Sequence, residues 1–350
     1  MEKSRLADLT ETVEAGRDLS PGEAKEAALA LASAADEPAV KERFLVALSE
    51  KGEAGAEVYA FAEAFRDLSR DPGVDAWAER AIDVCGTGGD RQGTFNISTV
   101  VALVLASAGV PVFKHGNSSV TSSCGSADLL QALGVPLEIE PGLARRSLEE
   151  LSFVFFFAPA YHPAFKEIVP VRKSLAAKGK PTIFNILGPM INPGRPAHQL
   201  MGVYSETWVP VLAEALHQLK LEGGYVVHGR LPDGAGMDEM SCATENRVAG
   251  FGRFRGTDEA WKAGRYSLPE CSLSELAGGG VAENLRLFQA ILQGEGPPGL
   301  VDSIILNAAF AFEIQGKAAT IEEGLGLARE QLLGGAVAEL CRKIKAFYAA

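Results

Sequence analysis

The pattern of apolar and polar positions changes character near residue 80. Before that point apolar residues such as Leu6, Leu9 and Val13 recur at helical spacing. The run Ser20-Pro21-Gly22-Glu23 has the residues of a helix cap, with proline in the first turn. Residues 1–75 contain no alternating strand pattern, so the sequence predicts an all-helical region there.

After residue 80, short β-branched or aromatic runs alternate with helical stretches, which is typical of a parallel α/β sheet. The predicted strands are Ile82–Val84, Val110–Phe113, Val154–Phe157, Thr182–Phe184 and Tyr225–His228. The predicted helices are Thr99–Ala108, Ala127–Leu133, Pro163–Leu175, Glu206–Leu219, Ala282–Leu292 and Ile304–Ala350. Loops are expected at Gly194–His198 and Gly229–Gly236.

Composition sets limits on this α/β protein. The chain has 350 residues, 47% hydrophobic and 22% charged, which is enough for two globular domains. Its net charge of −12 argues against a general nucleic-acid surface, although a local basic pocket remains compatible. Apolar runs such as Thr99–Ala108 are too short to span a bilayer, and the acidic N-terminus does not have the pattern of a signal peptide. Five cysteines without a C-x-x-C pair favour reduced thiols, so the sequence predicts a soluble cytoplasmic protein with no membrane partner.

The segment Asp83–Thr99 carries the strongest chemical signal. Its glycines Gly86, Gly88 and Gly89 follow a predicted strand and allow a tight turn whose backbone N–H groups converge. Asn96 and the hydroxyls after it come just before an apolar helix, where we expect them to form the cap. A glycine turn that opens onto a helix N-terminus binds anions, most often phosphate. The segment is neither a Walker loop nor a dinucleotide fingerprint, and the alternative is a purely structural turn.

A second polar loop follows the next strand. Lys114-His115-Gly116-Asn117 offers a cation, an imidazole and an amide, and Thr121–Asp128 adds hydroxyls at the start of another predicted helix. Two anion-binding loops at the same end of a parallel sheet suit a ligand with two phosphate groups. The alternative is a polar surface loop.

Two further sites are weaker when taken alone. His162 follows a strand, and Arg172 is expected about three turns along the helix after it, where its guanidinium could bind a carboxylate. Alternatively, His162 is structural and Arg172 forms a surface ion pair. Asp238 and Glu239 are adjacent carboxylates in a loop, of the kind that Mg²⁺ uses together with substrate phosphates, or else a solvated surface pair.

Together these segments resemble the anthranilate phosphoribosyltransferases of tryptophan biosynthesis, from about Leu6 to Ala349. The matching segments, in the family's order, are Asp83–Asp90, Asn96–Thr99, Lys114–Asn117, Gly125–Asp128, Ala158–Ala164, Pro170–Arg172, Thr182–Pro189 and Asp238-Glu239. Later matches are Ala282-Glu283-Asn284 and Leu306–Ala309.

The resemblance implies a fold with a small all-helical domain and a larger domain with a central, mostly parallel sheet flanked by helices. Residues 1–75, completed by helices near 165–200, would form the small domain. Residues 76–350 would form the α/β phosphoribosyl-binding domain, with the active site at the hinge. Members of this family are commonly homodimers.

The implied reaction is the Mg²⁺-dependent transfer of a phosphoribosyl group from phosphoribosyl pyrophosphate to anthranilate. Its products are N-(5-phosphoribosyl)anthranilate and pyrophosphate. By position, the implied phosphoribosyl pyrophosphate ligands are Gly86, Gly89, Asp90, Thr94, Asn96, Ile97, Ser98, Thr99, Lys114, Ser122 and Ser126. The implied anthranilate ligands are Gly86, His115, Asn117 and Arg172, and those of Mg²⁺ are Ser98, Asp238 and Glu239. The resemblance assigns no general base.

Three positions depart from the family's basic residues, namely Ser118, Ser123 and Pro181. Lost cations next to an anionic substrate each weaken binding by roughly 1 kcal/mol or more where the contact is partly desolvated. Two rival interpretations follow. One is a phosphoribosyltransferase of the same fold with a different aromatic amine acceptor. The other is a non-catalytic relative that binds nucleic acid or a partner; the related nucleoside phosphorylases match fewer of these motifs.

Overall fold

The computed structural model describes residues 4–118 and 123–349. In these residues an eight-stranded sheet has the order β3-β2-β1-β4-β5-β7-β8, and the short β6 pairs with β5. The strands are β1 (Ile82–Gly86), β2 (Val112–Gly116), β3 (Phe153–Phe157), β4 (His198–Gly202), β5 (Gly223–Arg230), β6 (Gly236–Met237), β7 (Glu245–Gly252) and β8 (Asp258–Lys262). Strands β1 to β5 pair in parallel, whereas β6, β7 and β8 join antiparallel. The expected α/β class with a mostly parallel sheet is confirmed.

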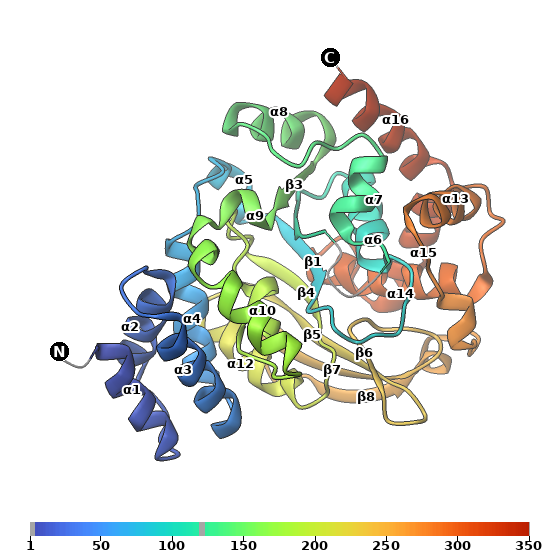
Figure 1. Cartoon of the computed structure of the whole chain (residues 1–350). Helices are drawn as coiled ribbons and strands as arrows, with labels where there is room; N and C mark the ends of the chain where they lie inside the picture. Colours follow the sequence, from blue (N-terminus) through green and yellow to red (C-terminus); the bar gives the residue numbers. More distant parts are fainter. Residues whose placement is uncertain (1–3, 119–122, 350) are drawn as a thin grey trace.

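Helices cover both faces of this sheet (Figure 1). On one side lie α1 (Arg5–Glu14), α2 (Pro21–Ala32), α3 (Pro38–Lys51), α4 (Gly55–Asp67), α10 (Val169–Ala177), α11 (Phe184–Leu187) and α12 (Trp208–Gln218). On the other lie α6 (Ile97–Ser107), α7 (Ser126–Ala132), α13 (Val281–Leu292), α14 (Pro298–Ile314), α15 (Ile321–Leu333) and α16 (Ala336–Ala349). Shorter or peripheral elements are α5 (Asp75–Ala78), α8 (Pro141–Leu151) and α9 (Ala158–Tyr161). No helix in the described part of the chain is long and apolar enough to cross a membrane.

The alternation of side chains along the strands divides the hydrophobic core. Leu200 on β4 and Val227 on β5 join the cluster around α6 and α14, whereas Met201 and Val226 join the cluster around α1 to α4. Successive side chains of a strand point to opposite faces of the sheet, so each strand contributes to both clusters. Fully buried parallel strands of this kind need helices on both sides.

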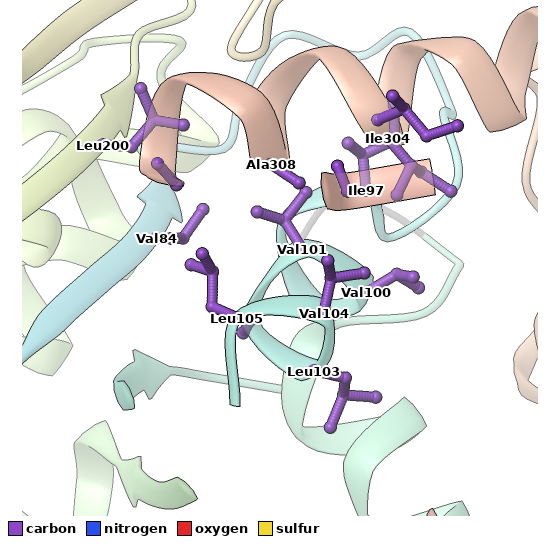
Figure 2. Packing of buried hydrophobic residues seen from close by; sticks show 14 of the residues in the cluster. Val84, Ile97, Val100, Val101, Leu103, Val104, Leu105, Leu200, Ile304 and Ala308 are labelled. Carbon is purple, nitrogen blue, oxygen red and sulfur yellow. The ribbon is translucent and has the colours of Figure 1, made fainter. Parts of the chain in front are cut away.

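Helix α6 is buried around nearly its whole circumference. Leu105 lies beside Val84 of β1, and Val101 faces Ala308 of α14 (Figure 2). A helix that is apolar on all sides is stable only inside a core. The first turn of α6 is therefore held firmly at the edge of the sheet where β1 ends.

The sequence misplaced one strand and missed four others. Thr182–Phe184 is not a strand, because Asn185 Oδ1 accepts a hydrogen bond from Thr182 N and turns the chain into α11. Strand β4 begins at His198, where we expected a loop to end, and it carries polar His198 and Gln199. Strands β6, β7 and β8 were also not predicted, and β5 continues to Arg230, into the expected loop Gly229–Gly236.

Two expected helices are interrupted. The stretch Pro163–Leu175 divides into a 3-10 turn, η1 (Pro163–Glu167), and α10, so Arg172 is the fourth residue of a new helix. The C-terminal stretch consists of α14, α15 and α16, and its breaks contain Gly316 and Gly335 with positive φ. Glycine accepts such backbone angles without strain and therefore ends helices.

Candidate active site

Two glycines at the ends of neighbouring parallel strands make room for an acidic loop. Gly86 ends β1 and Gly202 ends β4, and a Cβ atom on either residue would overlap Asp238. Beyond Gly86 the chain turns over Gly88 and Gly89, whose φ angles are +67° and +84°. L-residues with side chains rarely adopt these angles, so the turn requires glycine.

The carboxylates of Asp238 and Glu239 accept hydrogen bonds from the backbone amides that the sequence analysis predicted to bind an anion. Asp238 Oδ2 accepts a hydrogen bond from Gly88 N at 2.7 Å, and Glu239 Oε1 accepts one from Ser98 N at 3.1 Å. The expectation that the Asn96 side chain caps α6 is wrong, because its Nδ2 donates to Cys124 O at 3.0 Å instead. Glu239 supplies the acceptor at this helix N-terminus, where a negative charge is favourable.

Three carboxyl groups crowd together at this edge of the sheet. Burial raises the pKa of Asp238, and the neighbouring Asp90 raises it further. Burial and the neighbouring Asp238 raise the pKa of Glu239 well above its usual range. Asp90 Oδ2 and Glu239 Oε2 are buried and have no hydrogen-bond partner in the described residues. Unsatisfied buried carboxylate oxygens fit a divalent cation.

This donor set suits an ion that is shared with a substrate. In the residues that the structure describes, no group of three or more His, Cys, Asp or Glu side chains could hold a metal alone. Mg²⁺ is usually bound through one or two carboxylates together with substrate phosphates. The acidic loop therefore fits the magnesium that the sequence predicted there.

Lys114 supplies the positive charge next to these acids. It lies in β2, is 2% exposed, and its Nζ donates to Val84 O and to Ser98 Oγ, the latter at 3.2 Å. Asp83, fully buried on β1, accepts from Asn192 Nδ2 at 2.9 Å. Burial raises the pKa of Asp83 to about 6, against the opposing attraction of Lys114.

The other residues that were predicted to bind phosphoribosyl pyrophosphate lie around α6 and α7. Thr94 forms a β-bridge with Ala277, Ile97 is fully buried, and Thr99 Oγ1 is buried without a partner in the described residues. Ile97 can therefore offer only its backbone to a ligand. Ser126 packs on Gly116, where a Cβ would overlap its Oγ, and donates to Asn117 O at 3.4 Å. Ser122 lies outside the described residues.

Two histidines form the beginning of an apolar side of the site. The rings of His115 and His162 lie 5.2 Å apart, and both Nε2 atoms are buried without a partner in the described chain. Burial, with His162 as the second cause, lowers the pKa of His115 well below its usual range. Burial also lowers the pKa of His162 to about 4. Both imidazoles are therefore neutral near pH 7.

A row of rings connects these histidines to Arg172. His162 lies 5.8 Å from Phe165, Phe165 lies 5.4 Å from Phe184, and Arg172 Cζ is 5.6 Å from the centre of the Phe184 ring. Burial lowers the pKa of Arg172. Among the described residues no carboxylate forms an ion pair with this guanidinium, so the proposed surface ion pair is not observed.

The structure brings most of the expected residues together at the carboxyl ends of β1 and β2. Asn117 lies exposed just after β2, whereas Arg172 comes from a separate helix and reaches the site along the row of rings. The sequence analysis missed Phe165 and Phe184 and left His162 open. The only sequence signal for these residues was their position inside or next to the segments that match the family, around residues 158–172 and 182–189.

Known proteins resemble this chain over most of its length. The family described as "Glycosyl transferase family, a/b domain" matches residues 78–338. The anthranilate phosphoribosyltransferase of Persephonella marina is 37% identical over 348 residues, covering 99% of each chain. That of Parvibaculum lavamentivorans is 41% identical, covering 98% of this chain and 96% of the relative.

Solved structures extend the likeness to three dimensions. The crystal structure of anthranilate phosphoribosyltransferase from Thermus thermophilus has a TM-score of 0.89 and 40% identity, covering 98% of this chain and all of that one. The Saccharomyces cerevisiae enzyme in complex with phosphoribosyl pyrophosphate and Mg has a TM-score of 0.85 at 24% identity, covering 99% of each chain, which shows the shared fold. On the sequence matches across nearly its whole length, the chain belongs to the anthranilate phosphoribosyltransferase family.

Proposed function

We propose that this protein transfers a phosphoribosyl group from phosphoribosyl pyrophosphate to the amine of anthranilate and releases pyrophosphate, with Mg²⁺ as cofactor. One observation carries the proposal. An anion site with an acidic cation-binding loop lies at the ends of β1 and β2, and the row of rings that ends at Arg172 begins next to it at His115. A phosphorylated donor and an aromatic acid are the two ligands that this pairing suits.

The donor side is suited to bind and neutralise a diphosphate. The turn over Gly88 and Gly89, the first turn of α6 and the ammonium of Lys114 all face the same region. These groups would stabilise negative charge on a leaving group. The residues proposed here as phosphoribosyl pyrophosphate ligands are those that the resemblance implied.

Ser98, Asp238 and Glu239 would hold the cation. When bound, Mg²⁺ would neutralise charge on the diphosphate as it leaves. The unpartnered oxygen of Glu239, whose other oxygen accepts from Ser98 N, supports this assignment. The same assignment explains why buried acids persist at a site for an anion.

On the acceptor side, Arg172 would bind the carboxylate of anthranilate, and the rings of His115, His162 and Phe184 would enclose its benzene ring. A guanidinium pairs with a carboxylate through two parallel hydrogen bonds. The aromatic amine is neutral and nucleophilic at pH 7, so positioning suffices and we assign no general base. Neutral histidines avoid adding charge where the ribose carbon becomes electron-poor.

The proposal extends to organisation and location. We propose a small helical domain of residues 1–75 with helices near 165–200, and an α/β domain of residues 76–350. The shared hydrophobic cluster of α1–α4 with α10 and α11 supports it, although that cluster continues onto the sheet. A homodimer and a cytoplasmic location rest on the family resemblance, and the five cysteines, which form no disulfide among the described residues, agree with the latter.

The test follows anthranilate fluorescence with phosphoribosyl pyrophosphate and Mg²⁺, with and without the protein. Loss of fluorescence that depends on all three components supports the proposal. The serines at positions 118 and 123 favour one alternative, a different aromatic amine acceptor. Pyrophosphate release with another amine, but none with anthranilate, would select that alternative.

A further inference from the structure

Asn284 lies on α13, next to the loop at residues 93–99, and has no role in the reaction proposed above. It is the fourth residue of α13 and is 1% exposed. The chain before it runs alongside this loop: Phe95 N donates to Leu276 O, and Gly278 N donates to Gly93 O, each at 2.9 Å. The backbone leading to α13 therefore braces residues 93–95.

The side chain of Asn284 continues this contact into the site. Its Oδ1 accepts from Gly279 N at 2.7 Å, and its Nδ2 donates to Asn96 Oδ1 at 2.9 Å. Asn96 Nδ2 in turn donates to Cys124 O at 3.0 Å. Three consecutive hydrogen bonds thus join the start of α13, the start of α6 and the loop before α7.

Backbone groups at both ends fix the direction of this chain. Gly279 N can only donate, so it must face the oxygen of Asn284, and the Asn284 nitrogen must then face Asn96. Cys124 O can only accept, so it must face the nitrogen of Asn96. The two requirements agree, and only one orientation of the Asn96 amide satisfies every bond.

We propose that Asn284 is a positioning residue for phosphoribosyl pyrophosphate, an inference that rests on the proposed function. It fixes the orientation of the Asn96 amide and, through Asn96, the spacing between the loop at residues 93–99 and the loop before α7. Asn96 is half-buried, and each end of its amide has a further hydrogen-bonding position that the chain of three bonds does not use. A fixed amide presents a defined donor and acceptor to the substrate.

The substitution Asn284→Asp removes the bond to Asn96 while keeping the acceptor for Gly279 N. The carboxylate can still accept from Gly279 N, but it cannot donate to Asn96 Oδ1. We expect the KM for phosphoribosyl pyrophosphate to rise by about tenfold, equivalent to about 1.4 kcal/mol. The KM for anthranilate should stay within about twofold, because Asn96 lies on the donor side. Asn284→Leu, which adds no charge, should shift the two KM values in the same way.

A matched control removes buried hydrogen bonds far from the site. Ser147 on α8 is fully buried, and its Oγ bonds to Phe153 O and to the Tyr348 hydroxyl. Ser147→Ala should lower the melting temperature and leave both KM values unchanged. Equal changes in both KM values for the Asn284 variants, or none at all, would overturn the proposal.

A double-mutant cycle separates positioning from simple charge repulsion. If Asn284 acts through Asn96, Asn284→Asp should change the KM for phosphoribosyl pyrophosphate little in the Asn96→Ala background. Repulsion of the substrate by the new carboxylate would instead give the full effect in both backgrounds, which would contradict our inference.

Hydrogen exchange keeps the inference testable if the unsubstituted protein shows no turnover. In that case the proposed function fails, but Asn284→Leu should still speed amide exchange in residues 93–99 and 123–128. Ser147→Ala should leave exchange in both segments unchanged. Unchanged exchange in the Asn284 variant would overturn the positioning role independently of any activity.

Discussion

The donor side and the acceptor side of the site differ in their charge. The donor side concentrates charge, with Lys114 next to the acidic pair and the acids seated on backbone amides. The acceptor side carries little charge, because its two histidines are neutral. Among the described residues of the row of rings, Arg172 is the one cation. The donor side therefore has to rearrange its charges when a diphosphate and a cation bind. In the proposed function, the acceptor side would bind an aromatic acid without such a rearrangement.

The sharpest test of this contrast removes the acidic pair. Replacing Asp238 with Asn and Glu239 with Gln should abolish Mg²⁺-dependent turnover, because neutral amides are poor ligands for this hard cation. We expect the KM for anthranilate to change less than turnover, because the two acids lie on the donor side, on Gly88 N and Ser98 N. The measurement is steady-state turnover across a Mg²⁺ titration, and full activity of the double variant would contradict the assignment.

The same variant should not lose stability. The carboxylates repel each other and Asp90, whereas amide oxygens can still accept from Gly88 N and Ser98 N. Without metal at pH 8, we expect its melting temperature to equal or exceed that of the unsubstituted protein. A large decrease would mean that the acids are needed to hold the fold.

Arg172→Ala tests the other side. Removing a guanidinium that binds a carboxylate costs roughly 1.5–3 kcal/mol, so the KM for anthranilate should rise about ten- to hundredfold. The KM for phosphoribosyl pyrophosphate should change far less. Arg172→Lys is the matched variant: it keeps the charge but loses the bidentate geometry, and should recover only part of the affinity. Equal effects on both KM values would place Arg172 in the fold instead.

The contrast also explains what the sequence could reveal. The donor side lies mostly in one stretch, Gly86–Thr99, whose glycines and helix start act locally, so the pattern alone predicts an anion site. The adjacency of Asp238 and Glu239 was visible, but their seats on Gly88 N and Ser98 N depend on how β4 and β1 pair.

The acceptor side has no comparable local signal. Its rings come from β2, the end of α9, η1 and α11, and only tertiary packing brings them together. Strand β4 was missed for a related reason. His198 and Gln199 are polar in sequence, yet they are buried because β4 is an interior strand of a sheet whose two faces are covered by helices.

The neutral histidines predict an acid-sensitive fold. The pKa of His162 is about 4 in the folded protein and about 6.5 in an unfolded chain. Between these values the unfolded state binds more protons, so stability falls as the pH falls. This group alone should cost roughly 2 kcal/mol between pH 7 and pH 5. Between pH 7 and pH 5, the His162→Asn variant should lose roughly 2 kcal/mol less of its free energy of unfolding than the unsubstituted protein, as measured by urea unfolding at the two pH values. An equal loss in both proteins would mean that His162 is not buried in its neutral form.

The smallest effect is expected where the family's basic residues are missing. Ser118→Arg with Ser123→Lys restores two cations at the loop after β2, in which Ser123 is exposed. Lys114 and the amides of the glycine turn already face the anion, so the KM for phosphoribosyl pyrophosphate should fall by only a few fold. The exposed pair Ala319→Arg with Ala346→Lys adds the same charge away from the site and controls for long-range attraction. A gain of about tenfold or more, equivalent to about 1.4 kcal/mol, would show that the donor side of this chain is short of charge rather than complete.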